Sequence, residues 1–153
     1  MKEADLDEAG LVAWGTAVGK MVSPPLVLAL RGDLGAGKTT LARAIARGAG
    51  VTGTISSPTY NLLVRYAAPR DLDLVHIDLY RLEREEEVWE LGWSELPGPS
   101  DVVMIEWPSR AERLLPTPRW EISLEEIDGG EARRVTITAL GDPGPIELPG
   151  ARS

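Results

Sequence analysis

The sequence has 153 residues and is 43% hydrophobic, a size and apolar content that suit one compact domain over residues 1–153. Cysteine is absent, which excludes disulfide bonds and thiolate metal sites. The net charge of −8 argues against a protein that binds nucleic acid through a broad basic surface. Apolar runs are shorter than the ~20 residues of a membrane span, and the acidic start of the chain does not resemble a secretory signal. We therefore expect a cytoplasmic protein that does not engage a membrane.

The first predicted elements are a helix, a strand and a second helix. Apolar residues recur at helical spacing over residues 7–22, and the Ser-Pro-Pro sequence at 23–25 ends this helix. The apolar run over residues 26–30 predicts a buried strand, and the pattern that follows Lys38 predicts a helix.

Between that strand and the second helix lies the sequence GDLGAGKT, residues 32–39, which matches the phosphate-binding P-loop G-x-x-x-x-G-K-S/T. Its glycines let backbone N–H groups curl around phosphate oxygens, and the start of the helix adds its positive dipole end. We expect Lys38 to reach the β- and γ-phosphates and the Thr39 hydroxyl to bind Mg²⁺. A glycine-rich turn without a ligand is the alternative, but the strand and helix around the motif favour nucleotide binding.

A loop rich in Gly, Thr and Ser over residues 48–57 leads into Ser57-Pro58-Thr59-Tyr60. Many P-loop hydrolases carry a switch loop at this place, which the γ-phosphate and Mg²⁺ order. Thr59 is therefore a candidate to sense the γ-phosphate, and a Ser-Pro turn that opens a strand is the alternative.

Two strands are predicted next, over residues 60–67 and 72–79. The loop between them is short, so they should pair antiparallel and make the sheet mixed. Asp78 ends the second strand, where a Mg²⁺-supporting aspartate lies in P-loop enzymes. Alternation places His76, the only histidine, on the same side of the strand, although a lone histidine is more often structural.

A second carboxylate follows a second apolar strand. After an acidic, helical segment over residues 83–93, the strand over residues 101–105 runs directly into Glu106. An apolar strand that ends in a carboxylate is typical of a Walker-B-like residue, which holds Mg²⁺ or its water, or orients the attacking water. The alternative is a glutamate that caps the helix predicted over residues 109–115.

The remaining chain resembles a β-meander. It comprises alternating strands over residues 120–124 and 133–139, a turn at 128–130, and a short last strand over 146–148. All elements together predict an α/β fold, a three-layer P-loop NTPase-like domain with a mixed β-sheet.

Four motifs occur in a specific order: GDLGAGKTT at 32–40, SPTY at 57–60, HIDLYRL at 76–82 and IEWP at 105–108. On these motifs the chain resembles the TsaE (YjeE) family of small bacterial P-loop ATPases, over roughly residues 6–120. The resemblance implies that adenine is contacted partly near residues 7–11, that Asp78 is the aspartate of the third motif, and that Trp107 lies near the nucleotide. It also implies Mg²⁺ ligands at Thr39 and Glu106. The implied phosphate loop comprises Gly35, Ala36, Gly37, Lys38, Thr39 and Thr40.

The implied activity is Mg²⁺-dependent ATP hydrolysis that supports synthesis of N6-threonylcarbamoyladenosine (t6A) in tRNA through the TsaB–TsaD complex. Such a protein meets tRNA only indirectly, through that complex, and therefore need not be basic. Catalysis is expected to depend on Lys38, Asp78, Glu106 and Thr59. An arginine finger would come from a partner or from Arg65, Arg81 or Arg110.

Two other functions are compatible with a P-loop. A small-molecule kinase would need an acceptor pocket and an arginine-rich lid, and the nearest approach to such a lid is Arg81 with Arg84. A nucleotide-gated binding module would use ATP only to hold a surface in shape, and it would tolerate loss of Glu106.

Overall fold

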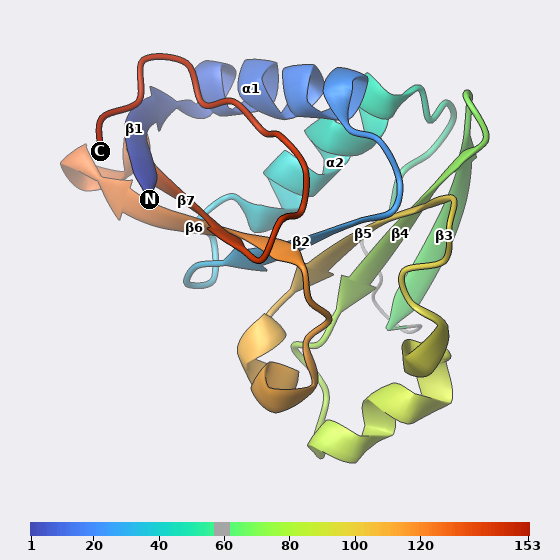
Figure 1. The fold of residues 1–153 in the computed structure, drawn as a ribbon. Helices are drawn as coiled ribbons and strands as arrows, with labels where there is room; N and C mark the ends of the chain where they lie inside the picture. Colours follow the sequence, from blue (N-terminus) through green and yellow to red (C-terminus); the bar gives the residue numbers. More distant parts are fainter. Residues whose placement is uncertain (57–61) are drawn as a thin grey trace.

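The chain folds around one seven-stranded mixed sheet (Figure 1), seen in a computed structural model that describes residues 1–56 and 62–153. The strands are β1 Lys2–Asp7, β2 Leu26–Arg31, β3 Leu63–Ala68, β4 Leu72–Asp78, β5 Asp101–Glu106, β6 Arg119–Ile127 and β7 Ala132–Leu140. Their order in the sheet is β1-β7-β6-β2-β5-β4-β3. The central strands β6, β2, β5 and β4 are parallel. At one edge β3 pairs antiparallel with β4, and at the other β7 pairs antiparallel with both β6 and β1.

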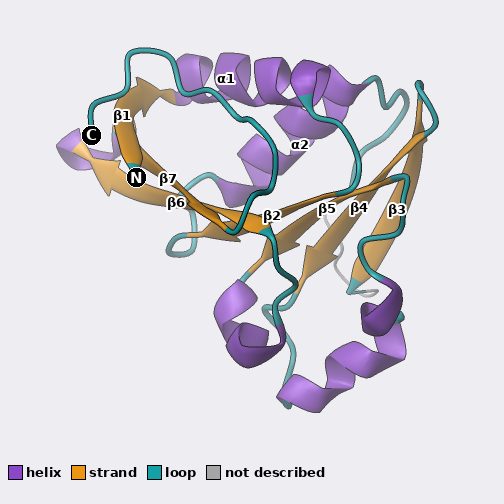
Figure 2. Cartoon of the chain, viewed as in Figure 1, coloured by secondary structure: helices purple, strands orange, loops and turns teal. Residues whose placement is uncertain are grey.

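Helices cover both faces of this sheet, which gives three layers (Figure 2). The two α-helices, α1 Glu8–Met21 and α2 Lys38–Ala49, lie together on one face. On the other face, at the β4–β5 side, lie the short 3₁₀ helices η1 Glu85–Leu91, η2 Trp93–Glu95 and η3 Pro108–Leu114, and a further 3₁₀ turn, η4 Asp128–Gly130, joins β6 to β7. None of the helices among the described residues is long and apolar enough to cross a membrane.

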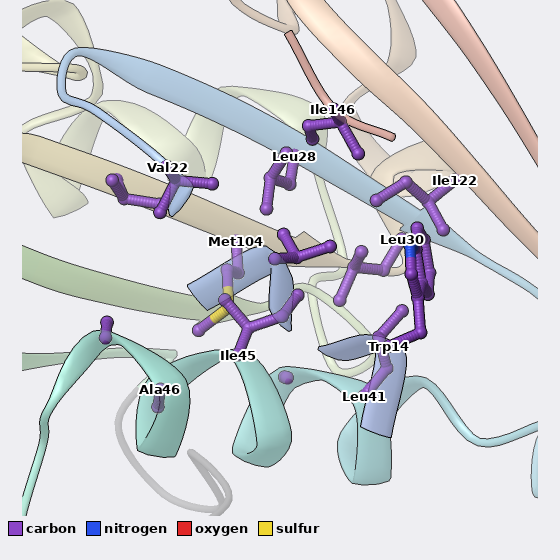
Figure 3. Close-up of a cluster of buried hydrophobic side chains, with 14 of the residues drawn as sticks. Trp14, Val22, Leu28, Leu30, Leu41, Ile45, Ala46, Met104, Ile122 and Ile146 are labelled. Atoms are coloured by element: carbon purple, nitrogen blue, oxygen red, sulfur yellow. The ribbon is translucent and has the colours of Figure 1, made fainter. Parts of the chain in front are cut away.

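Alternation along the buried strands divides the apolar side chains between two clusters. In β2, Leu28 and Leu30 face α1 and α2, and they pack with Leu41, Ile45 and neighbouring residues (Figure 3). Val27 faces the opposite side and joins the cluster beneath the 3₁₀ helices. Because both faces of β2 and β5 are covered, these strands are apolar along almost their whole length.

The structure confirms the predicted α/β class and most of the predicted elements, including the helix over 7–22, the P-loop strand and helix, the antiparallel pair β3–β4 and the meander β6–β7. The segments 83–93 and 109–115 form short 3₁₀ helices. Strand β1 was not anticipated.

The strand predicted over residues 146–148 is wrong, because the backbone there is irregular. Ile146 and Leu148 are nevertheless buried in the core, which explains the apolar pattern. Two tryptophans hold the segment in place: Trp14 Nε1 donates to Glu147 O at 2.7 Å, and Trp120 Nε1 donates to Gly144 O at 2.9 Å.

The two α-helices approach each other so closely that glycine is required at their contact. A Cβ atom on Gly48 would lie 2.0 Å from Thr16 O, and one on Gly19 would lie 2.0 Å from Ile45 O. Both obstacles are backbone atoms, so relief of the clash requires one helix to shift and the packing beneath α2 to change. This contact therefore sets how α2, and the P-loop before it, sits on the sheet.

We predict that Gly48→Ala lowers the free energy of unfolding by about 3 kcal/mol or more, at the upper end of the cost of overpacking a core. Urea denaturation followed by circular dichroism measures the change. The matched control is Arg43→Ala on the exposed side of α2, which should leave stability nearly unchanged. A Gly48→Ala protein as stable as the parent would contradict this account of the helix contact.

Candidate functional site

The P-loop joins the end of β2 to the start of α2 and has a backbone that requires glycine. Gly32 has φ of 151° and Gly37 has φ of 109°, values in the region that residues with a Cβ rarely adopt. At Gly32 a Cβ would also lie 2.6 Å from Leu124 O. Steric demands thus explain the glycines at positions 32 and 37 of the motif, independently of any ligand.

Lys38 is held across this loop with its side chain out of water, at 4% exposure. Its Nζ donates to Gly32 O at 2.5 Å and to Asp33 O at 2.8 Å, and it lies 4.3 Å from the centre of the Trp107 ring. Burial lowers the pKa of Lys38, and the nearby carboxylates of Glu106 and Asp78 act in the opposite direction. The ammonium is therefore a cation placed within the loop, beside an aromatic ring.

Glu106 ends the central strand β5, where it lies opposite Leu30 of β2 and Asp78 of β4 in the register of the sheet. Its carboxylate is only 2% exposed and has a partner on each oxygen. Thr39 Oγ1 donates to Oε1 at 3.0 Å, and His76 Nε2 lies 2.6 Å from Oε2. These contacts compensate the cost of a buried carboxylate and tie β4, β5 and the start of α2 together.

The predicted side-by-side placement of His76 and Asp78 on β4 is confirmed, but the two residues have different surroundings. His76 is 1% exposed and contacts the Glu106 carboxylate. Asp78 is half-buried, and its Oδ1 accepts a hydrogen bond from the Tyr80 backbone N–H at 3.0 Å. Burial raises the pKa of Asp78 and Glu106 raises it further, whereas the Tyr80 N–H lowers it.

These side chains surround a pocket of about 230 Å³ above the P-loop. The pocket brings together most of the residues predicted for the site, and it is lined by Leu34, Gly35, Gly37, Lys38, Thr39, Thr40, Asp78, Tyr80, Glu106 and Trp107. Of the other predicted residues, Ala36 is buried in the loop, and Thr59 lies outside the described residues.

The pocket has an aromatic wall that the motifs only partly revealed. Trp107 has φ of 55°, a conformation that strains a non-glycine residue and that turns its indole back toward the P-loop. The ring of Tyr80 lies 5.0 Å from that of Trp107, and Arg110 stands 5.7 Å from the Tyr80 ring. Tyr80 lies two residues after Asp78, so its place in the third motif was the available signal. Leu34, which is 74% exposed, lies at a position of the P-loop motif that accepts any residue, so the motif did not single it out.

Of the arginines considered as fingers, Arg110 therefore lies at the rim of the pocket. Arg65 lies far from it along the sheet, because it donates to Asp73 and Asp101, and Asp101 begins the strand that Glu106 ends.

A second, smaller cavity of about 100 Å³ lies beside the P-loop and is lined by Glu8, Leu11, Gly35, Gly37, Thr40 and Arg133. It places the start of α1 next to the loop. This is the stretch, residues 7–11, in which adenine contacts were expected.

The oxygen atoms at the pocket suit a hard divalent cation. The Thr39 hydroxyl and the Glu106 carboxylate are 3.0 Å apart, and Asp78 lines the same pocket. Within residues 1–56 and 62–153, however, no three His, Asp or Glu side chains are grouped closely enough to hold a metal ion. Mg²⁺ commonly takes one or two protein ligands and completes its shell with phosphate oxygens and water, so the donor set fits Mg²⁺ bound together with a nucleotide.

The family model described as "Threonylcarbamoyl adenosine biosynthesis protein TsaE" matches residues 6–135. The chain belongs to the TsaE family. It is 40% identical over 119 residues to the TsaE protein of Bacillus subtilis, an alignment that covers 78% of this chain and 73% of that protein. It is 37% identical over 124 residues to TsaE of Treponema pallidum, covering 81% and 90%.

A solved structure shares the fold of this chain. The crystal structure of Bacillus subtilis YdiB superposes with a TM-score of 0.77 at 28% identity, over 93% of this chain and 88% of that one. The TsaE family match ends at residue 135, so it includes the four motifs and the residues that line the 230 Å³ pocket and the 100 Å³ cavity.

We predict that Asp78→Asn raises the free energy of unfolding at pH 7, measured without nucleotide or Mg²⁺. The folded-state pKa of Asp78 is raised, so its ionised form costs stability above that pKa, and the cost disappears as pH falls through it. Asparagine keeps the acceptor for Tyr80 N–H and carries no charge.

The stabilisation should therefore shrink as pH falls toward the ordinary aspartate value of 3.8. Chemical denaturation at a series of pH values measures it. An Asp78→Asn protein less stable than the parent at pH 7 would contradict the raised pKa of Asp78 in the folded protein.

Proposed function

We propose that this TsaE-family chain is a Mg²⁺-dependent ATPase that supports t6A biosynthesis in tRNA. The observation that carries the proposal is the hydrogen bond between Glu106 Oε1 and Thr39 Oγ1 of the P-loop, at the carboxyl edge of the parallel strands. In P-loop enzymes a threonine and a strand-end carboxylate at this place hold Mg²⁺ against the phosphates. The relatives' names supply the pathway, since they are called tRNA threonylcarbamoyladenosine biosynthesis proteins.

The residues of the pocket have distinct roles in this proposal. Lys38 leaves the carbonyl groups that it now contacts and binds the β- and γ-phosphates, while Thr39 and Glu106 hold Mg²⁺. A metal ion held by these two residues would supply positive charge that offsets the charge developing on the phosphates. Asp78 lines the pocket, and the Glu106 carboxylate is close enough to help raise the pKa of Asp78. In this proposal Asp78 supports the metal or the attacking water.

The chain acts on tRNA indirectly in this proposal, through the TsaB–TsaD complex in the cytoplasm. A net charge of −8 supports contact through a protein partner, because a direct tRNA-binding surface would be basic. The exposed wall of the pocket, with Leu34 and Tyr80, leaves the nucleotide accessible to such a partner. The partner, or Arg110 at the rim, would supply the missing positive charge for rapid hydrolysis.

The decisive experiment measures the steady-state rate of ATP hydrolysis by the protein alone and with TsaB and TsaD added. We expect slow basal hydrolysis that changes when the partners are present. A hydrolysis rate that is the same with and without the partners, together with phosphorylation of a small acceptor, would contradict the proposal and establish a kinase.

We predict that Glu106→Gln lowers the rate of hydrolysis by at least about a hundredfold, the size of effect expected when a group that stabilises the transition state is removed. Glutamine preserves the shape and the hydrogen bond to Thr39, so ATP should still bind. A single-turnover assay together with a binding titration separates the two effects. If t6A synthesis continued undiminished with Glu106→Gln, the chain would be a binding module instead of a working ATPase.

We also predict that Lys38→Ala abolishes tight ATP binding, because it removes the buried ammonium that would neutralise the phosphates. Isothermal titration calorimetry measures the affinity, and Lys20→Ala at the end of α1 is the matched control. Equal affinity in the Lys38→Ala protein would show that ATP does not bind at the P-loop.

A further inference from the structure

The side chain of Arg133, on strand β7, contacts the backbone of the P-loop. Its Nε donates to Ala36 O at 2.7 Å, and its Nη2 lies 3.4 Å from Gly35 O. None of the four motifs contains this residue, and β7 is far from the P-loop in the sequence. Arg133 nevertheless contacts the loop directly, and it lines the 100 Å³ cavity beside the pocket that contains Lys38 and Glu106.

The contact to Ala36 O has a geometric consequence for the loop. The carbonyl of Ala36 and the N–H of Gly37 belong to one planar trans peptide unit, in which they point in opposite directions. A guanidinium that holds Ala36 O therefore directs Gly37 N–H away from Arg133. Gly37 lines the 230 Å³ pocket, so an N–H turned away from Arg133 would be available to phosphate oxygens bound there.

Arg133 is itself held rigidly, as a group that positions another must be. Its Nη1 donates to Gly130 O at 2.8 Å and to Ala132 O at 3.2 Å, and its Nη2 lies 3.5 Å from Glu126 of the neighbouring strand. Its side chain is 19% exposed. The planar guanidinium thus joins the turn between β6 and β7 to the P-loop, an arrangement that a lysine with its single flexible ammonium cannot reproduce.

We propose that Arg133 is a positioning residue that holds the P-loop in its phosphate-binding conformation. It acts through the Ala36–Gly37 peptide, and its side chain also lines the 100 Å³ cavity beside the start of α1. The inference rests on the proposed binding of ATP. It assigns to the β6–β7 meander, which carries none of the four motifs, a part in shaping the site.

The test compares the affinity for ATP with that for inorganic tripolyphosphate, which presents phosphates without a base or a ribose. In Arg133→Met we expect both affinities to fall by a similar factor, about tenfold, as for a lost charge-assisted hydrogen bond. Arg133→Lys keeps the charge but loses the fork, and it should also bind both ligands more weakly. The KM for ATP should rise with little change in kcat, because the loop binds the phosphates before and during the reaction.

The neighbouring Arg134 provides the matched control. It carries the same charge but pairs with Asp5 of β1 at 3.0 Å, so Arg134→Met should leave both affinities unchanged. Thermal unfolding checks that each variant is folded, and Arg133→Lys serves if Arg133→Met is not.

Three results would overturn the inference. Unchanged affinity in both Arg133 variants would show that the contact between Arg133 and the P-loop is not needed for phosphate binding. Full affinity in Arg133→Lys would show that only the positive charge of Arg133 matters. Weakened ATP binding with unchanged tripolyphosphate binding would indicate that Arg133 contacts the base or ribose. Failure of the parent protein to bind either ligand would instead refute the proposed function itself.

Discussion

The buried carboxylate of Glu106, at the carboxyl end of the central strand β5, is the constraint on which the site depends. Glu106 can remain at 2% exposure only because Thr39 and His76 each contact one of its oxygens. Those contacts require β5 to lie between β2 and β4 in one register, so that the P-loop, the histidine and the carboxylate meet. The order of the central strands and the position of α2 are therefore parts of the same arrangement.

The site keeps several features that cost stability. Asp78 carries a raised pKa because it is partly buried near another carboxylate. Trp107 adopts a left-handed backbone conformation, and the Lys38 side chain is buried inside the loop and removed from water. The surrounding core offsets these costs, since β2 and β5 are covered on both faces. The stability of the packed core thus allows the site to keep strained and charged groups.

The parts of the site that the sequence predicted are those encoded by local patterns. The P-loop is contiguous, and its glycines are required by backbone angles at Gly32 and Gly37. Asp78 and Glu106 could be predicted as site residues because a carboxylate directly after an apolar strand is a local signal. Parallel pairing then places both at one edge, as a general property of such sheets requires.

The parts that were missed depend on contacts between distant segments. Arg133 meets the P-loop only after β7 has joined the sheet, so nothing near it in the sequence indicates the contact. Strand β1 alternates weakly and is held by pairing with β7. Residues 146–148 show the reverse error, because an apolar pattern records burial and does not by itself specify a strand.

The measurement that tests the central claim most directly is the affinity of the protein for ATP with Mg²⁺ and with the metal removed by a chelator. If Thr39 and Glu106 hold a metal ion against the phosphates, ATP binds more tightly with Mg²⁺, and the difference shrinks in Thr39→Val, which keeps the shape of the side chain but loses its hydroxyl. Equal affinity with and without Mg²⁺ in the parent protein would contradict the account.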